Sequence, residues 1–201
     1  MAARGGYRSG MKAIPNLITL ARLLLTLAVF GALAIAASGL CEAAQLFWFA
    51  FWGFGLAAIT DFLDGWLARR WKAESLAGAI LDPIADKVLV AGAVVGLAIN
   101  GDQVAALTGG LVLFREFAIS ALREVLAPRG LRLPVTFLAK AKTTLQLLAL
   151  SAAILRLASP PWLGAEISLG IDLALWLAAI ATVWTGIEYG LSARRALTTV
   201  D

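Results

Sequence analysis

The chain has 201 residues, of which 61% are hydrophobic, and its mean hydropathy is +0.86. These values lie far outside the range of soluble domains and indicate a membrane protein. The absence of histidine and the single cysteine, Cys41, exclude His-ligated metals, Ser–His and Cys–His nucleophile pairs, Cys-rich zinc sites and an intramolecular disulfide. The net charge of +4 is attributed to membrane topology and anionic lipid headgroups rather than to nucleic-acid binding.

The N-terminal segment is basic and rich in glycine, and it is predicted to be a disordered tail over residues 1–12. One transmembrane domain is expected to follow over residues 13–201. Between residues 12 and 22, Asn16, Thr19 and Arg22 recur every three residues among apolar neighbours. This spacing predicts a short amphipathic helix at the membrane interface before the first span.

Six apolar segments are long enough to cross a bilayer as helices, which takes about 20 residues. They cover residues 14–37, 44–64, 78–99, 103–122, 137–157 and 166–190. The predicted fold is therefore an all-α bundle of six transmembrane helices. Lys and Arg gather at the N-terminus, around Arg69 and Arg129, and after the sixth segment, whereas Arg156 lies near an opposite end. The positive-inside rule then predicts that both termini are cytoplasmic, which agrees with an even number of spans.

Four aspartates lie at the end of the second span and the start of the third. Helical steps of three and four residues place Asp61 and Asp64 on one face, and Asp82 and Asp86 on another. A short turn joins the two segments, so the helices should run antiparallel and the carboxylates should converge. Four like charges would repel strongly, and a hard cation such as Mg²⁺ offsets that repulsion through the oxygen ligands it prefers. The alternative is an interfacial charge cluster paired with Arg69, Arg70 and Lys87.

The order of these residues resembles the signature of a known family. Asp61-x2-Asp64-Gly65-x2-Ala68-Arg69-x8-Gly78-x3-Asp82-x3-Asp86 is similar at every fixed position to the CDP-alcohol phosphotransferases, membrane enzymes of phospholipid synthesis. The resemblance implies six transmembrane helices, a homodimer, and two divalent ions, Mg²⁺ or Mn²⁺. It also implies that the four aspartates hold these ions against the diphosphate of a CDP-linked donor, and that Asp86 is the general base.

The segments that flank the signature resemble the bacterial members of the family that make phosphatidylglycerophosphate. These segments are IPNLITLAR, FREFAISALRE and AKAKTTLQLLAL. The implied substrates are CDP-diacylglycerol and sn-glycerol 3-phosphate, the implied products are phosphatidylglycerophosphate and CMP, and the implied location is the bacterial cytoplasmic membrane with a cytoplasmic active site. Other acceptors in the same family, namely inositol phosphate, serine or phosphatidylglycerol, remain alternatives.

Further residues are expected to contact the two substrates, from their charge and their places on the predicted helices. Donor contacts are expected from Asn16, Thr19, Arg22, Gly65, Ala68, Arg69 and Gly78. Phosphate of the acceptor is expected to meet Arg115, Arg123, Lys140 and Lys142, with Arg194 as a further candidate. Each cation has an alternative role in topology or snorkelling, and Arg115 has one as a structural pair with Glu116.

Two other functions use similar residues. Membrane prenyltransferases also pair aspartate-rich helices with Mg²⁺, but they usually need more spans and lack the Asp-Gly-x2-Ala-Arg continuation. A divalent-cation transporter could use intramembrane carboxylates without chemistry. It would have no need of Arg69, Gly65 or the second group of cations.

Overall fold

The computed structural model describes the backbone of residues 3–71, 76–131 and 137–198, and side chains over 17–63, 80–131, 141–195 and at 197. Within these ranges the chain is helical and has no strand, which confirms the all-α prediction. The α-helices are α1 (Ala3–Ser38), α2 (Ala43–Trp71), α3 (Leu76–Ile99), α4 (Gln103–Leu126), α5 (Phe137–Leu157) and α6 (Ala165–Thr198), with a 3₁₀ turn, η1, over Ala127–Arg129.

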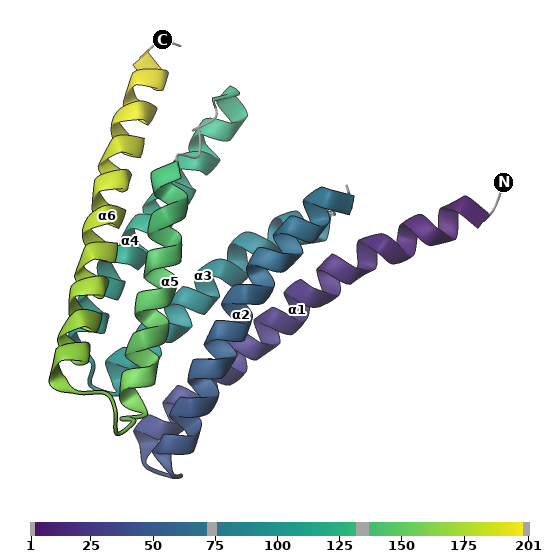
Figure 1. Cartoon of the computed structure of the whole chain (residues 1–201). Helices are drawn as coiled ribbons and strands as arrows, with labels where there is room; N and C mark the ends of the chain where they lie inside the picture. The colour runs from purple at the N-terminus through teal and green to yellow at the C-terminus, as the bar shows by residue number, and fades with distance from the viewer. Residues whose placement is uncertain (1–2, 72–75, 132–136, 199–201) are drawn as a thin grey trace. The chain divides into compact units, whose positions relative to one another are not determined.

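The helices form two compact units of three helices each (Figure 1). In the first unit, Met1–Asn100, α1 packs against both α2 and α3, and α2 also contacts α3. In the second unit, Gly101–Asp201, α6 packs against both α4 and α5. In each unit one long helix therefore carries most of the packing, and its buried face decides which side chains of the other two helices it meets.

Four of the helices contain segments long and apolar enough to cross a membrane within the described residues: Leu17–Ser38, Ala43–Leu63, Gln103–Arg129 and Ala165–Arg195. Large apolar side chains on them are exposed, for example Phe114 at 76% and Leu24 at 60%, as lipid contact requires. The described part of α3 carries three charged side chains, Asp82, Asp86 and Lys87, and the described side chains of α5 cover only residues 141–157, so neither is among these segments. A membrane crossing by these two helices therefore stays a prediction.

Helix α1 is continuous from Ala3 to Ser38. The sequence predicts a disordered tail over residues 1–12 and a separate interfacial helix, whereas the structure has one helix from Ala3 onwards. Extending a helix that is already nucleated forms one hydrogen bond for each residue that is fixed. This gain offsets the poor helix propensity of the glycines near the N-terminus. The helix ends at Ser38, and Gly39 follows with a φ of +71°, the left-handed conformation that commonly closes a helix.

Glycine brings α1 and α3 into close contact. A Cβ placed on Gly96 would lie 2.3 Å from Leu33 Cδ1 and 2.9 Å from Leu33 Cβ, so the two backbones approach more closely than a side chain permits. Asn100 closes the same end of the contact, because its Nδ2 donates to Leu33 O at 3.0 Å. Gly96 therefore allows close contact between α1 and α3 within the subunit.

Replacing Gly96 with alanine is expected to lower the stability of the protein in detergent. The added methyl group overpacks the contact with Leu33, at a cost of roughly 1–3 kcal/mol, while the gain in helix propensity returns about 1 kcal/mol at most. Thermal unfolding measures the difference. Gly110→Ala in α4 is the matched control, since a Cβ there meets no atom within 4 Å, and its unfolding temperature should not fall. Equal behaviour of the two variants would contradict the close contact.

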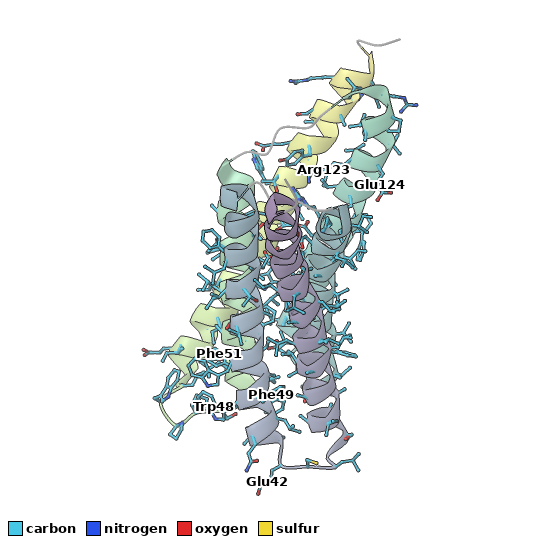
Figure 2. The ribbon with its side chains drawn as sticks, turned by 90° about the vertical axis from the view of Figure 1, so that its right-hand side faces the viewer. Glu42, Trp48, Phe49, Phe51, Arg123 and Glu124 are labelled. Carbon is cyan, nitrogen blue, oxygen red and sulfur yellow. The ribbon has the colours of Figure 1, made fainter. Side chains whose placement is uncertain are left out.

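Aromatic side chains gather at the start of α2, close to the turn that joins it to α1. Figure 2 shows Trp48, Phe49 and Phe51 along this end of the helix, with Glu42 at the turn itself. Trp48 and Phe51 meet edge to face with ring centroids 6.1 Å apart, and Phe49 is 48% exposed. Exposed aromatic rings beside a polar turn are typical of a membrane–water interface.

An ionic cluster joins the three helices of the second unit at the end where α5 finishes. Arg156 donates from Nη2 to Asp102 Oδ2 and from Nη1 to Asp172 Oδ1, each at 2.6 Å, and Nη1 also contacts the hydroxyl of Ser168 at 3.2 Å. Asp102 is also the N-cap of α4, where its Oδ1 accepts from Ala105 N at 3.0 Å. One arginine of α5 thereby connects the N-terminal ends of α4 and α6.

Candidate functional site

The buried face of α1 carries a line of polar side chains at helical spacing. Thr19, Arg22 and Thr26 are each 2% exposed or less, although their neighbours Leu20, Leu24 and Leu27 are exposed. Steps of three and four residues return to the same side of a helix, so these polar groups all face α2 and α3. The amphipathic pattern is therefore present, but in the structure its polar side is the buried one.

Arg22 lies at the centre of this face and contacts aspartates from two other helices. Its Nη1 contacts Asp61 Oδ1 of α2 and lies 3.2 Å from Asp86 Oδ1 of α3, while its Nη2 lies 3.5 Å from Asp82 Oδ1. Thr19 adds a hydrogen bond from Oγ1 to Asp82 Oδ1 at 2.8 Å. The structure thus brings together three of the four aspartates that the sequence singles out, around one guanidinium group.

The two sides of this ionic cluster differ in exposure. The Arg22 side chain is 0% exposed, whereas the side chains of Asp61, Asp82 and Asp86 are 36%, 45% and 54% exposed. The cation therefore lies on the inner side of the cluster, and the carboxylates reach the surface. Asp86, the expected base, is the most exposed of the three.

These three aspartates have the chemistry that a hard divalent cation requires, since carboxylate oxygens are the ligands that Mg²⁺ and Mn²⁺ prefer. Among the side chains that the structure describes, no group of three or more acidic or cysteine residues is arranged around a single metal position. Asp64, the fourth predicted ligand, lies outside these residues. The described carboxylates therefore have the ligand chemistry of a metal site and lie close together. In this structure all three contact Arg22.

Most of the predicted donor contacts lie outside the described side chains. Those of Asn16, Gly65, Ala68, Arg69 and Gly78 fall there. The two that are described, Thr19 and Arg22, both point towards carboxylates of α3.

A second polar cluster lies in the unit of α4, α5 and α6, around the buried Arg115. Its Nη1 donates to Glu116 Oε1 and its Nη2 to Thr185 Oγ1, both at 3.2 Å. Lys142 of α5, which is 3% exposed, donates from Nζ to the same oxygen of Glu116. One carboxylate oxygen therefore joins two predicted phosphate-binding cations.

Tyr189 of α6 joins the third cation to this cluster. The guanidinium carbons of Arg115 and Arg123 lie 5.4 and 5.7 Å from the centre of its ring, within cation–π range. Figure 2 labels Arg123 and Glu124 near the C-terminal end of α4. Gly186 gives Arg115 the room it needs, since a Cβ there would lie 2.9 Å from Arg115 Cγ. The structural Arg115–Glu116 pair that the sequence leaves open is present, but the same oxygen of Glu116 also binds Lys142.

Of the predicted acceptor residues, Arg115, Arg123 and Lys142 come together in this cluster. The side chain of Lys140 lies outside the described residues, and Arg194 is exposed near the end of α6. Sequence reasoning missed Thr185, Gly186 and Tyr189. Their signal is a pair of polar side chains four residues apart, with a glycine between them, on the buried face of an otherwise apolar helix.

Comparison of the sequence with known proteins places the chain in a family. The profile of the CDP-alcohol phosphatidyltransferases matches residues 12–185. A protein of Rickettsia felis named CDP-diacylglycerol–glycerol-3-phosphate 3-phosphatidyltransferase is 38% identical over 89% of this chain and 93% of its own length. Proteins with the same name are 43% identical in Sodalis glossinidius, over 72% of this chain and 78% of theirs, and 44% identical in Rickettsia bellii, over 68% and 74%. The family match includes the aspartates that contact Arg22 and, in the second cluster, Arg115, Arg123 and Lys142, and the chain belongs to the CDP-alcohol phosphatidyltransferase family.

Proposed function

We propose that this enzyme transfers the phosphatidyl group of CDP-diacylglycerol to sn-glycerol 3-phosphate, giving phosphatidylglycerophosphate and CMP. The observation that carries the proposal is the similarity to relatives of that name along 89% of the chain. The family match over residues 12–185 includes the four aspartates and the cations Arg115, Arg123, Lys140 and Lys142, so the similarity extends to most of the residues proposed to meet the substrates.

The carboxylates of the first unit are proposed to serve the donor. Members of this family generally depend on a divalent metal, and Asp61, Asp64, Asp82 and Asp86 are the residues that would hold two ions, Mg²⁺ or Mn²⁺. Bound ions supply neutralisation of the donor diphosphate and of the charge that develops on the leaving CMP. Gly65, Ala68 and Gly78 leave space for the nucleotide, while Asn16, Thr19, Arg22 and Arg69 supply polar contacts on its side of the site.

Asp86 is proposed as the general base. Its carboxylate accepts the proton of the acceptor hydroxyl, the hydroxyl oxygen forms a bond to the β-phosphorus of the donor, and the bond from that phosphorus to CMP breaks. The acceptor itself is the nucleophile, so no covalent enzyme intermediate is needed. The 54% exposure of the Asp86 side chain, the largest of the three described aspartates, supports this role because a base must reach a bound substrate.

The cluster around Arg115 is proposed to bind the phosphate of the acceptor. Arg115, Arg123 and Lys142 outnumber the single carboxylate of Glu116, so the cluster has an excess of positive charge. Guanidinium and ammonium donors form strong, charge-assisted hydrogen bonds with phosphate oxygens. Lys140 and Arg194 are further proposed contacts. A phosphate-bearing acceptor explains these cations better than serine does.

The proposed setting is the bacterial cytoplasmic membrane. The described spans support a multi-pass protein, and the basic residues at both termini and in the loops around Arg69 and Arg129 support a cytoplasmic location for the termini and the active site. Crossings by α3 and α5, and a homodimer as the family resemblance implies, belong to the same proposal.

Release of CMP tests the reaction and the acceptor together. Purified protein in detergent, given CDP-diacylglycerol and Mg²⁺ or Mn²⁺, is expected to release CMP when glycerol 3-phosphate is added, and to form phosphatidylglycerophosphate in equal amount. Serine, inositol phosphate and phosphatidylglycerol are the comparison acceptors. Preference for one of them would change the acceptor but keep the reaction type. Movement of the metal across vesicle membranes with no CMP release would favour the transporter.

A further inference from the structure

The placement of Arg22 raises a question that the proposed reaction does not answer. A site meant to bind divalent cations holds a cation of the protein itself, in contact with Asp61, Asp82 and Asp86. A positive charge this close should repel an incoming Mg²⁺ or Mn²⁺. Either Arg22 competes with the metal for the carboxylates, or it contributes something that outweighs the repulsion.

The burial pattern favours a contribution. The Arg22 side chain is fully buried, while the three carboxylates it contacts are between 36% and 54% exposed. The contacts of Arg22 with Asp61, Asp82 and Asp86 involve Oδ1 of each carboxylate. Arg22 therefore approaches from the interior, whereas an ion from solvent approaches from the exposed side. The two cations do not need the same position.

The arrangement of the helices gives the contact a positioning effect. Asp61 belongs to α2, and Asp82 and Asp86 belong to α3, so carboxylates of two helices must be held close against their mutual repulsion before any ion arrives. The planar guanidinium has several donors at fixed angles and can bind more than one carboxylate at once. Thr19 fixes Asp82 beside it, whereas Thr26, one turn further along, donates only to the backbone oxygen of Arg22 at 2.9 Å.

We infer that Arg22 is a positioning residue for the metal site: its guanidinium holds the carboxylates of α2 and α3 together from the buried side, so that a divalent ion binds to a ready-made ligand set. This inference rests on the metal-binding part of the proposed function. It adds a role that contact with the nucleotide alone would not give Arg22.

The inference makes a prediction opposite to that of simple electrostatics. Removing a positive charge from an acidic site should strengthen cation binding if charge alone matters. If Arg22 orders the ligands, Arg22→Gln should instead weaken Mn²⁺ binding by about 10–100-fold, the usual loss when a partner that orients metal ligands is removed. Isothermal titration of Mn²⁺, or the paramagnetic resonance signal of free Mn²⁺, measures the affinity in detergent without substrate or turnover.

Two further variants separate positioning from charge and from packing. Arg22→Lys keeps the charge but has one nitrogen in place of the fork, so its Mn²⁺ affinity should fall towards that of Arg22→Gln. Thr26→Val changes the same buried face of α1 one turn away and touches no carboxylate, so its affinity should match that of the unsubstituted protein. Thermal unfolding in the absence of metal identifies any variant that fails to fold, and Arg22→Lys then carries the comparison.

The outcomes distinguish this inference from the proposed reaction. Equal or tighter Mn²⁺ binding by Arg22→Gln would overturn positioning and show that Arg22 competes with the ion, even if the protein turns over glycerol phosphate normally. Weaker binding by Arg22→Gln and Arg22→Lys would support positioning, even if a different acceptor proved correct. A lack of Mn²⁺ binding by the unsubstituted protein would overturn both this inference and the metal part of the proposed function.

Discussion

Asp86→Asn is expected to lower kcat by roughly 10²–10⁴-fold, the usual contribution of a positioned general base. The amide has the shape of the carboxylate and keeps one oxygen that can bind a metal, but it does not accept the proton of the acceptor hydroxyl. Binding of CDP-diacylglycerol and of Mn²⁺ should therefore change much less than turnover. Single-turnover release of CMP, measured with saturating metal and both substrates, isolates the chemical step.

Glu42→Gln is the matched control for this prediction. It also converts an acid to an amide in the first unit, at the exposed turn before α2, where Figure 2 labels Glu42, and its kcat should equal that of the unsubstituted enzyme. Recovery of Asp86→Asn at high Mn²⁺ would mean that Asp86 binds metal and is not the base. Full activity without extra metal would remove Asp86 from both roles.

Arg115→Ala is expected to raise the KM for glycerol 3-phosphate by about 10–100-fold, since a hydrogen bond to a charged group contributes about 1.5–3 kcal/mol. The KM for CDP-diacylglycerol should change far less. A purely structural role for Arg115 would instead lower the amount of folded enzyme and leave both KM values close to those of the unsubstituted enzyme. Initial rates at varied concentrations of each substrate measure the two constants separately.

Two companion variants sharpen the result. Arg115→Lys keeps the charge but is not expected to maintain both the Thr185 hydrogen bond and the contact with the Tyr189 ring, so its KM should lie between those of the unsubstituted enzyme and Arg115→Ala. Arg129→Gln, at an exposed position in the same unit, should leave the KM for glycerol 3-phosphate unchanged. A larger rise in the donor KM than in the acceptor KM would move Arg115 out of the acceptor site.

Sequence spacing predicted the carboxylate cluster because helical geometry is local. Residues three or four apart share a face whatever surrounds them, so Asp82 and Asp86 had to lie together once α3 formed. Spacing also placed Thr19 and Arg22 on one face of α1, but it could not say which helix that face meets. That face contacts carboxylates about 60 residues later in the chain, and this contact depends on the packing of α1 against α3.

The cluster around Arg115 shows the same limit. Its cations were identifiable because charge in an apolar helix is costly and has few structural uses. Tyr189 and Gly186 were not, because a tyrosine and a glycine are ordinary residues in such a helix, and only the position of Arg115 beside them gives them a role. The N-terminal segment is helical although its composition predicts disorder, because the long apolar helix that follows extends into it.

The cluster around Arg156 bears on how the second unit is assembled during synthesis. Its three charged groups leave the ribosome in the order acid, base, acid: Asp102 before Arg156, and Asp172 afterwards. When Arg156 emerges, one of its two counter-ions already exists at the same end of the unit, and the second follows within the next helix. Alternating charges in this order allow the guanidinium to be neutralised at each stage of insertion, so the nascent chain is never required to hold that cation alone.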